Sequence, residues 1–137
     1  MRIYVDSSAL IKRVIDEPES DALDEALERH IAVDDVLVAS SLAWVEVTRA
    51  IRATAVGEAD VSDLIEAALS GLAERPLAAD VVSLARRISP ESLGDLDAIH
   101  LATAVLLDAD LIVTYDTRLD AAARYNGLAV AKPLNKS

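Results

Sequence analysis

Short apolar runs typical of β-strands alternate along this chain with segments of helical spacing, and this alternation limits the possible folds more than any other feature. The runs are residues 2–5, 36–39, 111–115 and 128–131. Segments with apolar residues at every third or fourth position separate them. Strands joined through helices pair in parallel, and the helices cover both faces of the sheet. The sequence therefore predicts a three-layer α/β/α domain with a short, mainly parallel central sheet.

Helix-starting hydroxyls, prolines and glycines mark where the helices begin and end. The expected helices cover residues 9–14, 20–30, 42–55, 61–72, 78–88, a segment around Asp97, and 117–125. Pro18, Pro76 and residues 57–60 interrupt the pattern, and Asn126-Gly127 ends the last helix. No repeat or linker is evident, so residues 1–137 are expected to form a single domain with a polar tail over 132–137.

Composition narrows the class of protein further. Of the 137 residues, 53% are hydrophobic and 27% are charged, which argues against disorder, and the absence of cysteine excludes disulfides and thiolate metal sites. Residues 1–6 have the pattern of a strand and not of a signal peptide. The longest apolar stretch, 101–113, contains Asp108 and Asp110 and is too short to span a bilayer. A soluble cytoplasmic protein is expected.

The formal net charge of −11 restricts how the chain interacts with nucleic acids. Most of such a surface repels a phosphate backbone. Any chemistry on nucleic acid therefore requires a local basic patch or bound cations.

The most informative stretch is 96–104, in which Asp97 stands in the first turn of an otherwise apolar helix. A loop with proline, serine and glycine, 88–94, precedes it. A carboxylate at this position either stabilises the helix end or acts as a metal ligand. Taken alone, Asp97 favours helix stabilisation.

Three further acidic residues occupy positions that the predicted fold brings to the same edge. Asp6 and Asp116 are the first polar residues after the first and third apolar runs, and Glu46 stands one turn into the helix that follows the second. Sites in open α/β sheets form outside the carboxyl ends of the strands. Clustered carboxylates oppose folding unless a cation neutralises them, and oxygen ligands of this kind suit Mg²⁺ or Mn²⁺. Such an ion can activate water against a phosphodiester.

Each of these residues also has a simpler interpretation. Asp6 and Asp116 can cap the helices that follow them, and Glu46 can pair with Arg49 three residues later on an exposed helix face. His100 follows Asp97 by three residues, which raises the question of a zinc site. No second histidine lies nearby in the sequence, so packing at the start of the helix is expected instead.

Together, the four acidic segments resemble the motifs of PIN-domain ribonucleases. The matching segments are 5–10 (Val-Asp-Ser-Ser-Ala-Leu), the helix with Glu46, 96–104 (Leu-Asp-Ala-Ile-His-Leu-Ala-Thr-Ala) and 113–119 (Val-Thr-Tyr-Asp-Thr-Arg-Leu). Their order and the overall length resemble the VapC toxins of prokaryotic toxin–antitoxin pairs, over almost the whole chain. The segment 96–104 is the most specific of the four matches, whereas the assignment of Glu46 to its motif depends on spacing alone.

The resemblance implies a metal-dependent endoribonuclease. Asp6, Glu46, Asp97 and Asp116 would surround one or two Mg²⁺ or Mn²⁺ ions. Activated water would attack the phosphorus of RNA and leave a 5′-phosphate and a 3′-hydroxyl. Hydroxyl groups beside the carboxylates, those of Ser7 and Thr114, would orient carboxylates or water.

The resemblance also implies partners. These are a second copy of the chain, in a homodimer, and a cognate VapB-type antitoxin whose C-terminal segment covers the site. The apolar faces of helices 61–72 and 20–30 are the expected docking faces for the antitoxin.

Basic residues near the acidic positions are candidate phosphate contacts. They are Lys12, Arg13, Arg49, Arg52 and Arg118. Solubility and surface ion pairs explain each of them equally well. The aromatic residues, Trp44, Tyr4, Tyr115 and Tyr125, are too few for a stacking platform, so RNA binding is expected to depend on metal and shape.

Two other functions fit parts of the pattern. A phospho-receiver module is also a parallel α/β domain, and Lys132-Pro133 resembles its Lys-Pro element. Its phosphoacceptor is missing, however, because Ser40-Ser41 follows the second strand. A phosphatase with an Asp-x-Asp nucleophile lacks its second aspartate, because Ser8 stands there. A catalytically inert PIN-like scaffold remains the main alternative to the ribonuclease.

Overall fold

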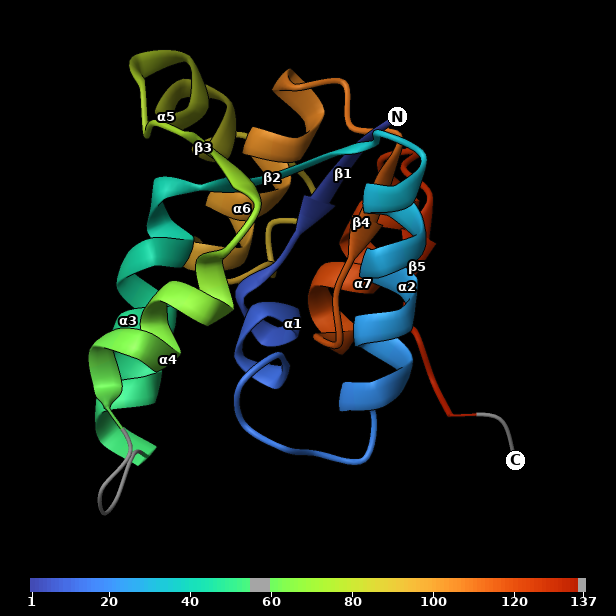
Figure 1. Ribbon diagram of the computed structural model, residues 1–137. Helices are drawn as coiled ribbons and strands as arrows, with labels where there is room; N and C mark the ends of the chain where they lie inside the picture. The colour runs from blue at the N-terminus through green and yellow to red at the C-terminus, as the bar shows by residue number, and fades with distance from the viewer. Residues whose placement is uncertain (55–59, 136–137) are drawn as a thin grey trace.

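The computed structural model describes residues 1–54 and 60–135, which form a central sheet with helices on both faces (Figure 1). The strands of this five-stranded sheet run in the order β3-β2-β1-β4-β5, and every adjacent pair is parallel. Their bounds are β1 Arg2–Val5, β2 Val36–Ser40, β3 Leu72–Arg75, β4 Leu111–Val113 and β5 Val130–Ala131. The predicted three-layer architecture is confirmed, and the sheet in the described residues is parallel throughout.

The helices alternate with these strands. Their bounds are α1 Ser7–Lys12, α2 Ser20–Ala32, α3 Ser41–Thr54, α4 Val61–Leu69, α5 Ala79–Ala85, α6 Asp95–Leu106 and α7 Thr117–Tyr125. The last of these agrees with the predicted bounds at both ends. None of the helices described is long and apolar enough to cross a membrane.

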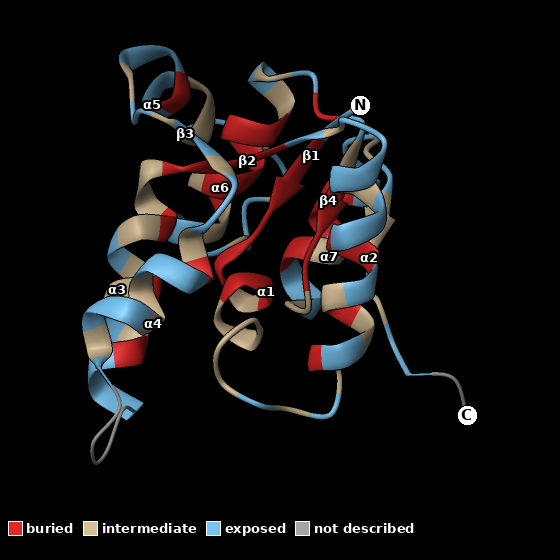
Figure 2. Ribbon diagram, in the orientation of Figure 1, coloured by how far each residue is buried: buried red, intermediate tan, exposed pale blue. Residues whose placement is uncertain are grey.

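Successive residues of β1 point to opposite faces of the sheet and divide the core in two. Ile3 and Val5 pack in one cluster with residues of α1, α2, α3 and α4, whereas Tyr4 packs in the other with residues of α6 and α7. Burial on both faces explains why β1, β2 and β4 are mainly apolar. The buried residues follow the strands, and the outer surface of α2 is exposed (Figure 2).

The strand order reverses where β1 meets β4, and we call the space outside the carboxyl ends of these two strands the crevice. From β1 the chain extends the sheet through β2 and β3 on one side, and it later returns to add β4 and β5 on the other. In such sheets, this reversal opens a site outside the carboxyl ends of the two central strands. Val5 and Val113 are register partners at those ends, and the backbone N–H of Asp6 donates to the carbonyl of Val113 at 3.0 Å. Asp6 and Thr114 therefore begin the floor of the crevice.

The predicted helix over 61–72 is wrong at its C-terminal end. α4 ends at Leu69, and Gly71 follows in the left-handed region with φ +75°. That conformation suits glycine because it has no Cβ, and it turns the chain into β3. β3 is an edge strand with the half-polar sequence Leu-Ala-Glu-Arg, so it lacks the apolar run on which the strand predictions depended.

Other boundaries are shorter than predicted. The helix expected over 78–88 is α5, which ends at Ala85, and the strands expected over 111–115 and 128–131 pair only as β4 and β5. The break predicted at 57–60 lies outside the described residues, except for Asp60. Its carboxylate accepts from the N–H of Ser62 at 2.9 Å and caps α4.

Candidate metal-dependent active site

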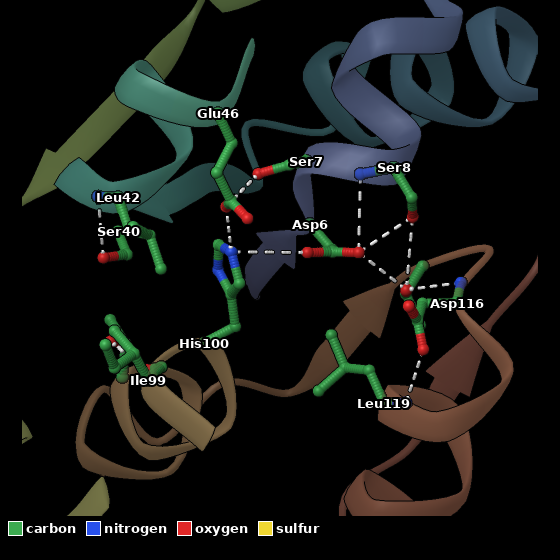
Figure 3. A network of polar contacts seen from close by, with 12 residues as sticks. Asp6, Ser7, Ser8, Ser40, Leu42, Glu46, Ile99, His100, Asp116 and Leu119 are labelled. Carbon is green, nitrogen blue, oxygen red and sulfur yellow. Dashed lines mark hydrogen bonds and ion pairs between the residues drawn. The ribbon is translucent and has the colours of Figure 1, made fainter. Parts of the chain in front are cut away.

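Asp6 lies directly after β1 and is 4% exposed. Its Oδ2 accepts hydrogen bonds from Ser8 Oγ at 2.8 Å and Thr114 Oγ1 at 2.9 Å, and it caps α1 through the N–H of Ser8 at 3.4 Å. Its Oδ1 points the other way, 3.6 Å from Nε2 of His100 (Figure 3). Hydrogen bonds to Oδ2 therefore cap α1 and fix the carboxylate of Asp6, whereas Oδ1 faces the crevice.

Glu46 reaches the same place from α3. Its Oε1 accepts from Ser7 Oγ at 2.7 Å and lies 2.5 Å from His100 Nε2. In the described residues, Glu46 makes these contacts and not the alternative pairing with Arg49. Burial by itself raises the pKa of Glu46, but the hydrogen bond and charge of His100, together with the Ser7 hydroxyl, outweigh it and lower the pKa. Glu46 is thus held as a carboxylate.

His100 is the residue of this site whose role the sequence analysis missed. It is 1% exposed, and its Nδ1 lies 2.6 Å from Tyr4 Oη, which also accepts from the N–H of Ser40 at 3.2 Å. Because the carboxylate of Glu46 only accepts, Nε2 of His100 carries a proton. The spacing of three residues places Asp97 and His100 on one helix face, but it gives no sign of the contact between His100 and Glu46.

The charges around His100 change its pKa. Burial alone lowers the pKa, but the hydrogen bond to Glu46 and the negative charges of Asp6, Glu46 and Asp97 outweigh burial and raise it. The imidazole is therefore a partial counter-charge between two of the predicted carboxylates (Figure 3).

Asp97 differs from the other carboxylates because its side chain has no hydrogen-bond or ion-pair partner among the residues described. It stands in the first turn of α6, and the N-cap of that helix is Gly94. Burial first, and then the charges of Asp116, Asp6 and Glu46, raise the pKa of Asp97 to about 6, against the opposing effect of His100. The charges of Asp116, Asp6 and Glu46 therefore act on Asp97 in addition to its burial.

Asp116 follows β4 at the opposite side of the crevice from Glu46. Its Oδ1 caps α7 by accepting from the N–H groups of Arg118 and Leu119, both at 2.9 Å. Its own N–H donates to Thr114 Oγ1 at 3.0 Å. Thr114 is fully buried and thereby connects Asp116 to Asp6. As with Asp6, one carboxylate oxygen caps a helix.

The carboxylates of the candidate site offer the type of oxygen ligand that a hard divalent cation prefers. As the side chains are placed, no three acidic or histidine residues of the described chain stand close enough to share one ion. Asp6 Oδ1, Asp97 and the second oxygen of Asp116 are nevertheless carboxylate oxygens around one crevice, and Asp97 has the raised pKa of a carboxyl among uncompensated negative charges. Mg²⁺ and Mn²⁺ prefer such oxygens and would relieve that repulsion.

Of the basic residues near the site, two have structural partners. Arg13 donates to the carbonyls of Ala68 and Ser70 at 3.0 and 2.8 Å, so it fastens α4 to α1 instead of remaining available for phosphate as expected. Lys12 pairs with Glu17 and Glu19. Arg49, Arg52 and Arg118 have no side-chain partner in the part of the chain described.

Comparison with known proteins decides the family. The profile of the PIN domain matches residues 3–125. The chain is 40% identical over 135 residues to Ribonuclease VapC46 of Mycobacterium tuberculosis, covering 96% of this chain and 97% of the relative. It is 37% identical over 133 residues to Ribonuclease VapC47 of the same species, covering 96% of each. The chain belongs to the PIN-domain family, among its VapC ribonucleases.

Solved structures of PIN-domain proteins share the fold. VapBC2 from Rickettsia felis, bound to a promoter DNA fragment, matches with a TM-score of 0.76 at 16% identity, covering 96% of this chain and 98% of that one. The Sarcin-Ricin loop cleaving toxin VapC20 of Mycobacterium tuberculosis matches with a TM-score of 0.66 at 15% identity, covering 88% of this chain and 94% of that one. The VapC architecture is therefore retained here at low sequence identity.

Proposed function

We propose that this VapC-family chain is an endoribonuclease toxin that uses Mg²⁺ or Mn²⁺ held by Asp6, Asp97 and Asp116, with Glu46 beside them. One observation carries the proposal: the half-buried side chain of Asp97 has no partner in the described residues, and burial together with the charges of Asp116, Asp6 and Glu46 raises its pKa. A structural carboxylate would instead have a hydrogen-bond donor. When bound, the ion would activate water for attack on the phosphodiester and neutralise charge on the phosphate.

The chain's own residues prepare this site. Ser8 and Thr114 orient Asp6 through two hydrogen bonds to the same oxygen, and Ser7 and His100 orient Glu46. Such groups behind the ligands fix the direction of the carboxylate oxygens. The products we expect are a 5′-phosphate and a 3′-hydroxyl.

We also propose a cognate VapB-type antitoxin, a homodimer and a cytoplasmic location. The similarity to VapBC2 from Rickettsia felis and to VapBC-1 from nontypeable Haemophilus influenzae supports the antitoxin. The net charge of −11 also suits a basic or Arg-rich segment as the covering partner.

The test is cleavage of pooled cellular RNA by purified, antitoxin-free protein with Mg²⁺, Mn²⁺ or chelator. Asp97→Asn removes one charge and keeps the shape of the side chain. Asp95→Asn is the matched control, since Asp95 is an exposed acid in the same helical turn. We expect discrete, metal-dependent cuts by wild type and Asp95→Asn, and loss of at least 100-fold in rate in Asp97→Asn, about 3 kcal/mol of transition-state stabilisation. Folded wild-type protein that leaves RNA intact would favour the inert scaffold.

A further inference from the structure

A second recess lies beside the carboxylate site, between the loop before α6 and the outer face of α7. Its volume is about 520 Å³. Its apolar floor is formed by Pro90, Leu93, Ala121 and Ala122. Arg118 and Tyr125 stand at its two ends. The side chain of Asn126 fastens the loop to the end of α7 by donating to the carbonyl of Ser89 at 2.8 Å. We call this recess the α7 groove.

Tyr125 supplies an open aromatic face at one end of the α7 groove. It is 73% exposed, whereas Tyr4 is fully buried. Tyr115 donates its hydroxyl to the carbonyl of Pro133, and Trp44 packs against the core. Tyr125 is therefore the one exposed aromatic ring in the described chain. A single ring is no stacking platform, but it is enough to stack one base.

Arg118 supplies a cation at the other end. Its side chain is exposed and has no hydrogen-bond or ion-pair partner in the residues described, whereas Arg124 on the same helix pairs with Asp120. Arg118 and Tyr125 are seven residues apart, so they share a face of α7 at about 10 Å along its axis. The N–H of Arg118 donates to Asp116, which places the start of the groove next to the carboxylate site.

We propose that the α7 groove binds an RNA nucleotide adjacent to the cleaved bond, with its base stacked on Tyr125 and its phosphate at Arg118. This inference rests on the ribonuclease function proposed above. An apolar floor, one flat ring and one cation are complementary to a base with its phosphate. The volume of about 520 Å³ lies in the range of small-ligand pockets, which suits a single nucleotide.

A neighbouring recess adjoins the α7 groove. It holds about 680 Å³ between α5 and α6 and shares Pro90 and Leu93 with the α7 groove. Arg86 and Arg87 line it, and neither has a side-chain partner in the described chain. Glu91 and Asp95 line this recess as well, so its two arginines do not make it a positive surface, and the proposal rests on the α7 groove alone.

The test measures RNA binding without cleavage. The probe is a fluorescein-labelled single-stranded RNA of random sequence, about ten nucleotides long. Its anisotropy is titrated with protein that carries Asp97→Asn, in chelator. On this background, Tyr125→Ala should weaken binding about 10- to 100-fold, and Tyr125→Phe should retain it, because phenylalanine keeps the stacking face.

Arg118→Gln should weaken binding and make the slope of log K against log salt shallower by about 0.7, the value for one phosphate on a single strand. The substitution keeps the backbone N–H that caps α7. Arg29→Gln is the matched control, because Arg29 is an exposed arginine on α2, which packs on the opposite face of the sheet. It should leave the slope unchanged.

Three results would overturn the α7 groove as an RNA site. The first is wild-type affinity in both Tyr125→Ala and Arg118→Gln. The second is an equal loss in Arg29→Gln, which would assign the effect to net charge. The third is unchanged RNA binding by Tyr125→Ala together with a changed sedimentation coefficient. This result would show that the groove is a contact between copies of the chain and not an RNA site. Metal-dependent cleavage by wild type is scored separately, so a ribonuclease that lacks this subsite is distinguishable from a chain that does not cut RNA.

Discussion

At the scale of single residues, Asp97 contributes to the way in which the stability of the metal-free protein depends on pH. Its carboxyl has a pKa of about 6 in the folded chain, above the ordinary value of 3.8. A raised pKa means that this group stabilises the fold fully below pH 3.8, and that the contribution is lost as the pH rises through 6. Because the group is partly exposed, about 1 kcal/mol is the expected size of the effect.

Asp97→Asn should therefore stabilise the protein in chelator at pH 7 by about 1 kcal/mol, because it removes the repulsion with the other carboxylates. The difference should disappear below about pH 4, where the wild-type carboxyl is protonated in both states. Urea unfolding at several pH values measures it. Greater stability of wild type at pH 7 without metal would contradict the account of the site.

Tyr4 connects the buried His100 to the backbone of Ser40 and is a second residue whose substitution is informative. Tyr4→Phe keeps the ring but leaves the N–H of Ser40 without its acceptor, and it should cost about 1–3 kcal/mol of stability. The pKa of His100 should also change, which the C2 proton resonance in NMR reports. An unchanged titration of His100 would show that the hydroxyl of Tyr4 does not orient the imidazole.

At the scale of elements, Thr114 links β4, β1 and α7, because it donates to Asp6 and accepts from the N–H of Asp116. Thr114→Val preserves the shape but removes both hydrogen bonds. We expect a loss of about 1–3 kcal/mol and a 10- to 100-fold weaker affinity for Mn²⁺. Thr114→Ser should restore most of both. If the Thr114→Val variant binds Mn²⁺ as tightly as wild type, the hydroxyl of Thr114 does not position the carboxylates.

The elements that could be predicted from the sequence are those with a strong local signal. β1, β2 and β4 are mainly apolar runs, and the predicted acidic positions Asp6 and Asp116 follow β1 and β4 in the chain. β3 has no such signal: it is a short edge strand whose place depends on pairing with β2. The role of His100 was missed for a similar reason, because Glu46 approaches it from a helix 54 residues away in the chain. Long-range contacts of this kind leave no local pattern.

At the scale of the whole molecule, a net charge of −11 must coexist with an anionic substrate. Arg49 and Arg52 line a hollow of about 350 Å³ on α3, the helix that carries Glu46. Replacing both with glutamine should weaken binding of single-stranded RNA uniformly across sequences and make the salt slope shallower by about 1.4. Arg29→Gln is again the control. A slope equal to that of wild type would show that phosphates do not contact this end of α3.

The central claim is that four carboxylates at the carboxyl ends of the strands form one divalent-metal site. Titration of the protein with Mn²⁺, followed by electron paramagnetic resonance of the free ion, tests it most directly. Wild type and Asp95→Asn should remove free Mn²⁺ from solution with the same affinity, and Asp97→Asn should bind at least 10-fold more weakly. Equal binding by wild type and Asp97→Asn, or no binding by folded wild type, would contradict the account.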